Sequence, residues 1–134
     1  MRIGPWPCQA VKIDCFDDFS GLTSMTQDVV VVLSNAPDLL LAKRIAHMLV
    51  EENLAACVNL GAPVLSMYMW EGELEGTEEI PLVIKTTKAA LPALTARLTE
   101  LHPYEVPEIL VVPVIGGAQS YLDWVRSQAI APKP

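Results

Sequence analysis

The order in which apolar spacing changes along the chain is the feature that most restricts its fold. A continuous β-branched run, VVVVL at 29–33, is typical of a strand buried on both faces. Apolar residues at helical spacing follow it, and later segments switch between the two-residue and the helical period. The predicted elements are a strand at 29–33, a helix that starts within 34–38 and ends at 52, an extended stretch at 56–70, a turn at 71–77, a strand at 80–87, a helix at 91–101, a strand at 109–115 and a helix at 120–127.

This β-α-β-β-α-β order predicts an α+β, ferredoxin-like (split βαβ) fold. In such a fold an antiparallel sheet carries two helices on one face, and here a short C-terminal helix is added. We expect one domain at 26–128, preceded by an irregular N-terminal extension at 1–25 and followed by a tail at 129–134. The regular pattern begins at Met25, so a further hypothesis is that Met25 is the functional start.

The middle hairpin is too long for a sheet of this size. Its strands are expected to extend beyond the body, with Met67 and Met69 on one face and Tyr68 and Trp70 on the other. Hydrophobic residues make up 51% of the chain, yet its longest apolar runs are far shorter than the roughly 20 residues that span a bilayer. Both features predict that these side chains are buried against other copies of the chain.

Charge and cysteine content narrow the function classes. The formal net charge of −7 repels phosphate backbones, which predicts no nucleic-acid partner, and the short apolar runs predict no membrane insertion. Three cysteines without a CxxC pair argue against a disulfide framework. Together with an N-terminus that lacks the apolar segment of a secretory signal, they predict a cytoplasmic protein.

Four motifs occur in order along this domain: LAACVNL at 54–60, MYMWEGELE at 67–75, LVIKTT at 82–87 and HPYEVPEIL at 102–110. Together they resemble the CutA divalent-cation tolerance family. The resemblance implies a cytoplasmic homotrimer, related in architecture to the PII signalling proteins, whose long hairpins pack on neighbouring subunits. It also implies a role in copper or other divalent-metal tolerance, with no enzymatic activity attached. The trimer interface would then include the hairpin residues Met67, Tyr68, Met69 and Trp70.

His102 is the candidate metal ligand. A neutral imidazole binds copper or zinc well, and the resemblance implies a copper site at this histidine in some family members. Two other ligand positions of those members correspond to Ser34 and Leu101 here, so two of the three donors are missing. The alternative is structural, because His102 ends a helix before Pro103, where the helix dipole favours a cationic ring.

Lys85, Tyr104, Glu105 and Glu108 form the candidate inter-subunit cleft. The glutamates beside a tyrosine could bind a cation, or act with Lys85 in acid–base chemistry on a small substrate. If Glu108 begins the last strand, we expect it to form a cross-strand ion pair with Lys85. The prolines in HPYEVPE also allow a second interpretation, in which the segment is a stiff corner between a helix and a strand.

The leading prediction is a trimeric, non-enzymatic protein of metal-ion tolerance that binds copper or another divalent cation weakly. Catalytic templates such as G-x-S-x-G, H-E-x-x-H and the P-loop are absent from the sequence. The thioethers of Met67 and Met69 suit Cu(I), although methionines on an apolar face are more often interface packing. The alternative is a PII-like regulatory trimer that binds a small metabolite or a protein partner at the cleft between subunits.

Overall fold

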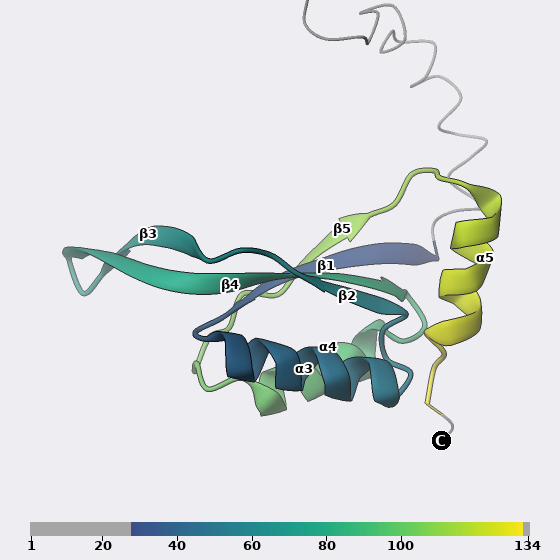
Figure 1. Cartoon of the computed structure of the whole chain (residues 1–134), viewed down its shortest axis with the longest axis horizontal. Coiled ribbons are helices and arrows are strands. Elements are labelled where there is room, and N and C mark those ends of the chain that lie inside the picture. The colour runs from purple at the N-terminus through teal and green to yellow at the C-terminus, as the bar shows by residue number, and fades with distance from the viewer. Residues whose placement is uncertain (1–27, 133–134) are drawn as a thin grey trace, which may run out of the picture.

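The computed structural model describes residues 28–132, and Figure 1 shows their arrangement. The elements in chain order are β1 (Val29–Ala36), α3 (Leu39–Glu51), β2 (Cys57–Leu60), β3 (Val64–Trp70), β4 (Glu73–Thr87), α4 (Leu91–Leu101), β5 (Leu110–Pro113) and α5 (Gln119–Gln128). This is the predicted order, since β2 and β3 together form the bent extended stretch at 56–70.

The strands form one antiparallel sheet with the order β2-β4-β1-β5, and β3 pairs with β4 outside this row. α3 and α4 lie together under one face of the sheet, and α5 lies at one end of it (Figure 1). The predicted α+β, ferredoxin-like arrangement is confirmed. The trimer stays a prediction, because the structure contains one chain.

The main core lies between the sheet and the two helices below it. The side chains that fill it are at most 1% exposed: Val32, Ile45, Leu49, Leu82, Ile84, Leu94 and Leu98. A smaller cluster includes Val29 of β1 and Leu122 and Val125 of α5, so it attaches the C-terminal helix to the sheet. Burial of these side chains is the main source of stability for a domain of this size.

The other face of the sheet, which we call the open face, has no helix of the described residues over it (Figure 1). Strand alternation places Val31, Leu33 and Val83 on this face, and each is half-buried. Leu110 and Val112 of β5 lie beside them and are 55% and 41% exposed. The open face is therefore mostly apolar, yet it faces solvent in the single chain.

The start of α3 differs from the prediction of a helix start within 34–38. β1 continues to Ala36, because its backbone keeps pairing with β4. Asp38 is the N-cap, and its Oδ1 accepts a hydrogen bond of 2.8 Å from the Leu41 N–H. Ser34 is consequently a strand residue, and its side chain is buried.

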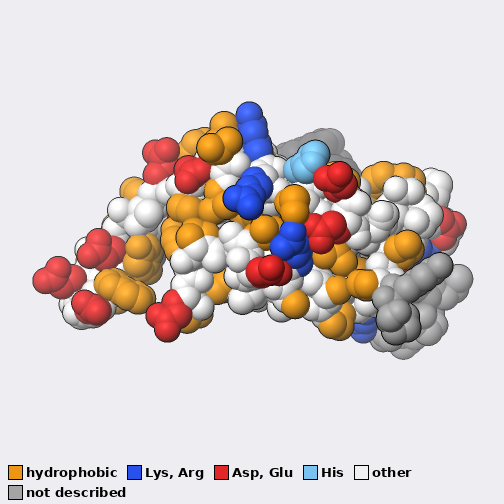
Figure 2. Space-filling model, turned by 90° about the horizontal axis from the view of Figure 1, so that it is seen from below, with side chains coloured by type: hydrophobic (Ala, Val, Ile, Leu, Met, Phe, Trp, Pro, Cys, Tyr) orange, Lys and Arg blue, Asp and Glu red, His pale blue; other side chains and the backbone are white. Residues whose placement is uncertain are grey.

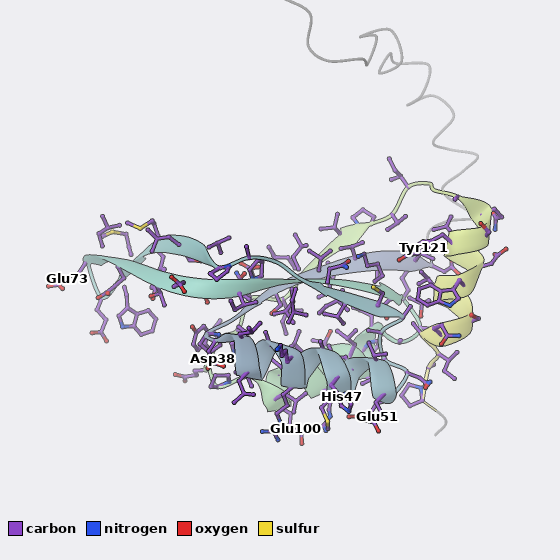
Figure 3. All side chains as sticks on the ribbon, viewed as in Figure 1. Asp38, His47, Glu51, Glu73, Glu100 and Tyr121 are labelled. Carbon is purple, nitrogen blue, oxygen red and sulfur yellow. The ribbon has the colours of Figure 1, made fainter. Side chains whose placement is uncertain are left out.

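β3 and the first half of β4 form an arm that extends beyond the body (Figure 1). The turn predicted at 71–77 is shorter than expected, because only Glu71 and Gly72 separate the strands, with φ of 51° and 80°. Left-handed φ at both positions is what a two-residue hairpin turn of this type requires. Residues 73–79 pair with β3 and are strand, and Glu73 marks the tip of the arm in Figure 3.

Two predictions concern the N-terminal segment, which the described residues do not include. The irregular extension at 1–25 and the hypothesis about Met25 lie outside the described residues. Within residues 28–132, none of the helices combines the length and the apolar content needed to cross a bilayer.

Candidate functional site

The segment HPYEVPE forms a corner at one end of the sheet. α4 ends at Leu101, and His102 is its C-cap, with a ψ of 134° that leaves the helical region. Pro103 cannot continue the helix hydrogen bonding, because it has no N–H. The chain then turns back across the sheet and enters β5 at Leu110. The segment is thus a corner, as one of its two interpretations predicts.

His102 is buried at this corner, with 6% of its surface exposed. The Tyr104 backbone N–H donates to its Nδ1 at 3.2 Å, so Nδ1 is an acceptor. Nε2 therefore carries the proton of a neutral ring and donates to the Asn35 carbonyl at 2.7 Å. This differs from the cationic ring expected at a helix end, because the backbone N–H of Tyr104 requires a lone pair on the imidazole.

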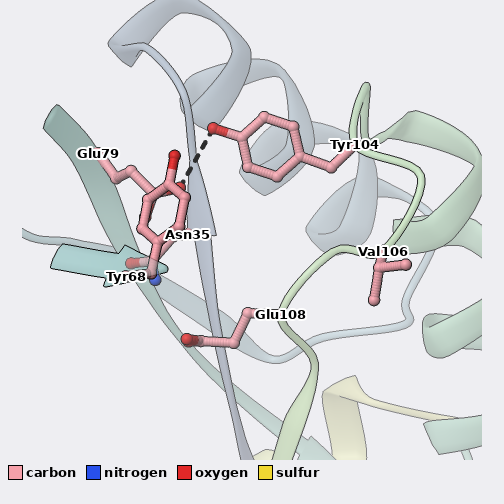
Figure 4. Close-up of a pocket in the computed structure, with 6 residues that line it drawn as sticks. All are labelled: Asn35, Tyr68, Glu79, Tyr104, Val106 and Glu108. Atoms are coloured by element: carbon pink, nitrogen blue, oxygen red, sulfur yellow. Dashed lines mark hydrogen bonds between the residues drawn. The ribbon is translucent and has the colours of Figure 1, made fainter. Parts of the chain in front are cut away.

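An inner cleft of about 260 Å³ lies between the corner and the root of the arm (Figure 4). The Tyr104 hydroxyl donates to Glu79 Oε2 at 3.2 Å, and Glu79 is only 8% exposed. Glu108 approaches the same space from the corner (Figure 4). The complete lining is Asn35, Tyr68, Glu79, Tyr104, Val106 and Glu108. β1, the arm and the corner therefore each contribute to this cleft.

An outer cleft of about 670 Å³ adjoins the inner one on the side of the arm. Both clefts share three lining residues, Tyr68, Tyr104 and Val106, and the outer cleft adds Trp70, Glu75 and Glu105. The Tyr68 hydroxyl lies 2.8 Å from Thr77 Oγ1, a hydrogen bond that restrains the ring on the arm. Two tyrosine rings thus lie between an inner and an outer acidic space.

Comparison with known proteins gives the family. The model of the CutA1 divalent ion tolerance protein family matches residues 30–128. The divalent-cation tolerance protein CutA of Thermus thermophilus is 48% identical over 96 residues, which cover 72% of this chain and 93% of that protein. The chain belongs to the CutA1 family.

Solved structures of CutA1 proteins agree with this assignment. The divalent cation tolerance protein CutA1 of Thermus thermophilus superposes with a TM-score of 0.74 at 46% identity, covering 75% of this chain and 98% of that chain. CutA1 from the psychrotrophic bacterium Shewanella sp. SIB1 superposes with a TM-score of 0.76 at 37% identity, covering 81% and 99%. The described fold is therefore the CutA1 fold, and the resemblance inferred from the four motifs is confirmed.

The two clefts of this CutA1-family chain are acidic. They are lined by Glu75, Glu79, Glu105 and Glu108 and by no lysine or arginine of the described residues. Burial raises the pKa of Tyr104, and the charge of Glu79 and the hydrogen bond to it raise that pKa further. The phenol therefore stays protonated at neutral pH and acts as a donor. The clefts offer oxygen atoms and aromatic rings, which suit a cation.

The donors for copper that the CutA resemblance implies do not come together here. Ser34 Oγ is buried and has no hydrogen-bond partner among the described residues, and the side chain of Leu101 has no donor atom. Both ring nitrogens of His102 are hydrogen-bonded within the chain. Residues 28–132 hold no group of three or more His, Cys, Asp or Glu side chains placed to bind a metal. Metal at His102 stays a prediction, which this donor set does not favour.

The structure does not bring Lys85 into either cleft. β1 lies between β4 and β5, so Lys85 is not adjacent to the last strand. It is paired with Val31 and Cys57 instead, and the predicted ion pair between Lys85 and Glu108 is wrong. A catalytic group of Lys85, Tyr104 and Glu108 is therefore not formed within one CutA1-family chain.

The arm residues have more than the predicted packing role. Tyr68 and Trp70 line the clefts, whereas the sequence predicts them only as interface residues. Met67 and Met69 point to the other side of β3 and are 56% and 64% exposed. Their place in a trimer interface stays a prediction.

The clefts also include Asn35, Glu75 and Glu79, which the sequence motifs do not assign to the candidate cleft. Glu75 is the register partner of Tyr68 in the arm, and Glu79 follows it on the same side of β4. A count outward from a two-residue turn would have found both, because strand alternation fixes the side on which each residue lies. Asn35 depends on the longer β1, which local sequence does not reveal.

Proposed function

We propose that this chain forms a cytoplasmic homotrimer that supports tolerance of divalent metal ions, copper among them, by binding cations weakly and without enzymatic turnover. Membership of the CutA1 divalent ion tolerance family supports the tolerance role. A chain of three cysteines without a CxxC pair supports the cytoplasmic location.

Exposed apolar side chains support the homotrimer. Met67, Met69 and Trp70 of the arm are 56%, 64% and 61% exposed, and the open face adds Leu110 and Val112 of β5. Soluble monomers rarely expose continuous apolar surface of this extent. Figure 2, which views the molecule from the helix side, shows lysine, arginine and carboxylate side chains spread among the apolar ones there. The exposed apolar side chains of the arm and the open face are the surface that we expect another copy to cover.

The acidic outer cleft is the observation that carries the metal-binding part of the proposal. Glu75 and Glu105 are exposed carboxylates that line the same space beside Tyr68 and Tyr104. Carboxylate oxygens suit hard divalent cations, and ligands this exposed leave most of the hydration shell of the ion in place. We therefore expect weak binding, with a Kd on the order of 1 mM.

Isothermal titration calorimetry with Mn(II), Zn(II) and Cu(II) tests this proposal. The double substitution Glu75→Gln with Glu105→Gln is expected to abolish the binding. The matched control, Glu71→Gln with Glu73→Gln, removes the same charge at the tip of the arm and should leave the binding intact. Equal loss in both variants would mean that ions only gather on an acidic surface. Absence of any binding by the wild-type chain up to about 10 mM metal, ten times the expected Kd, would refute the metal function.

The size and lining of the outer cleft support a second candidate, a PII-like regulatory trimer that binds a small metabolite or a protein partner there. A space of about 670 Å³ with Tyr68, Trp70 and Tyr104 in its wall lies in the range of small-molecule sites. Its carboxylates favour a neutral or cationic ligand. A thermal-shift screen of amines, nucleotides and organic anions tests this candidate, because a specific ligand raises the melting temperature. A screen without any shift would remove it.

A further inference from the structure

The inner cleft holds negative charge that no basic side chain of residues 28–132 neutralises. Glu79 is 8% exposed, and within the described residues its side chain has one hydrogen bond, from the Tyr104 hydroxyl. Glu108, which is exposed, lines the same space, and neither carboxylate belongs to an ion pair within residues 28–132. A buried carboxylate is costly unless a cation or several donors accompany it. Burial of Glu79 therefore favours a cation in the inner cleft, and residues 28–132 place none there.

Lys85 carries a positive charge that has no anionic partner within residues 28–132. It is half-buried on the open face, between Val31 of β1 and Cys57 of β2. Neither neighbour carries a negative charge, and Lys85 joins no ion pair in the part of the chain that the structure describes. Most of the open face around it is apolar, so burial of this face would also remove the ammonium from water. Lys85 therefore lacks an anion.

One chain cannot bring these groups together, although both belong to the same side of β4. Glu79 and Lys85 are an even number of residues apart, so strand alternation points both side chains to the open face. The six residues of strand from 79 to 85 separate them by about 20 Å. That distance is several times the length of a lysine side chain, so the cation must come from elsewhere.

We infer that Lys85 of a second copy of this chain enters the inner cleft and neutralises Glu79 and Glu108. The inference rests on the homotrimer proposed above and adds the contact that completes its cleft. Because the lysine and the cleft occupy different parts of one face, the contact is head-to-tail, and head-to-tail contacts that close form rings. The rings of Tyr68 and Tyr104 add cation–π attraction for the entering ammonium.

A second copy fits this role better than a small amine from solution. The open face around Lys85 includes the half-buried Leu33 and Val83 and the exposed Leu110 and Val112. Another copy that inserts Lys85 covers this apolar surface in the same step, which adds hydrophobic stabilisation to the charge pairing. A free ammonium ion would neutralise the cleft and leave the apolar surface in water.

A charge swap tests the contact, with subunit association measured by analytical ultracentrifugation over a dilution series. Lys85→Glu and Glu108→Lys, each alone, should weaken association at least tenfold, because each places like charges together. The double variant should recover association to within about threefold of wild type, as expected for groups in direct contact. Lys43→Glu, an exposed change of the same charge on α3, is the matched control and should have no effect. Single variants that associate like wild type, or a double variant that does not recover, would overturn the inference.

Chemical rescue provides a second readout that does not depend on charge reversal. Lys85→Ala leaves the cleft without its cation, and added butylammonium should restore association of this variant. The same amine should do nothing for wild type, whose cleft is filled, or for Lys85→Ala combined with Glu79→Gln and Glu108→Gln. An equal response of wild type and Lys85→Ala would show that the cleft stays open in the assembly, which contradicts the inference.

These results separate the contact from the proposed function. A wild-type chain that sediments as a folded monomer at every concentration removes the homotrimer, and the Lys85 contact with it. A stable trimer that binds metal as proposed but shows neither charge-swap recovery nor amine rescue leaves the proposed function intact and refutes only the Lys85 contact.

Discussion

The helix side and the open side of this molecule differ in how their apolar side chains are buried and how their charges are paired. On the helix side, buried leucines and isoleucines fill the core, and charged side chains find partners within the chain. The ion pairs of the described residues all involve helices or residues that flank them: His47–Glu51, Arg97–Glu52, Arg97–Glu100, Arg126–Asp28 and Arg126–Asp123. Figure 3 shows His47 and Glu51 on α3, away from the sheet.

The arm and the open face show the opposite pattern. Many of their apolar side chains are exposed, and none of the charges of Lys85, Glu79 or Glu108 is paired within residues 28–132. The hydrogen bonds of this side include those of Tyr104 to Glu79 and of Tyr68 with Thr77. The difference is that contacts within the chain satisfy the helix side, whereas the other side keeps exposed apolar groups and unpaired charges within residues 28–132, as the proposed homotrimer requires.

The largest expected contrast between the two sides comes from leucine-to-alanine substitutions. Leu98→Ala in the core, where the side chain is fully buried, should lower the free energy of unfolding by about 2–5 kcal/mol at any protein concentration. Leu110→Ala on β5, where the side chain is 55% exposed, should mainly weaken association. It should therefore change only the part of the free energy of unfolding that depends on protein concentration. Urea unfolding over a dilution series measures both. Equal, concentration-independent losses would contradict the division between the sides.

The two histidines give the next largest contrast. His102→Ala removes two hydrogen bonds of a buried ring and should lower the free energy of unfolding by roughly 1–3 kcal/mol. His47→Ala on the exposed surface of α3 loses only a pair with Glu51 and should cost less than about 0.5 kcal/mol. The calorimetric metal titration of His102→Ala should match that of wild type. A folded His102→Ala chain that no longer binds metal would place the metal at the corner instead of the outer cleft.

The same division explains what could be predicted from the sequence. Core positions such as Leu94 and Leu98 repeat at helical spacing, and β1 is a continuous apolar run, so local periodicity was sufficient to find the helices, the strands and their order. The end of β1 and the extent of the arm were missed, because both depend on pairing with a distant segment of β4. Polar residues such as Asn35 and Glu75 are in strands because of that pairing, although their intrinsic preference for strand is low.

The residues of the candidate site also differ in whether local sequence or strand order determines their position. Tyr104 and Glu108 were found because they belong to one continuous motif at the corner. Glu79 was not assigned to the cleft and the ion pair between Lys85 and Glu108 was wrong, because both depend on which strands are neighbours in the sheet. Strand order is a non-local property, and insertion of β1 between β4 and β5 separates residues that motif reading had joined.

Titration of Tyr104 gives a smaller effect that is confined to the open side. The pKa of Tyr104 lies above its ordinary value of 10.0, so the linked stabilisation is fully present below about pH 10 and is lost as the pH rises through the folded pKa. Glu79→Gln removes the nearby charge and should lower the pKa of Tyr104 toward its ordinary value, which makes the alkaline loss of stability smaller. Ultraviolet absorbance of the ionised phenol follows this change. Glu75→Gln in the outer cleft is the control. If it shifts the pKa of Tyr104 as much as Glu79→Gln does, the effect comes from the overall negative charge of the clefts and not from contact with Glu79.

The smallest expected effect tests whether the arm is organised by its own turn or by a partner. Glu71 has a φ of 51°, a left-handed conformation that disfavours glutamate more than asparagine, so Glu71→Asn should raise the free energy of unfolding by a few tenths of a kcal/mol. Gly72→Ala should lower it by about 1 kcal/mol, and since an added Cβ there meets no atom within 4 Å, the loss would come from its φ of 80° alone. Thermal unfolding at low protein concentration measures both changes. If neither substitution has an effect, the turn does not limit the stability of the chain, and the conformation of the arm must be set by contact with another copy.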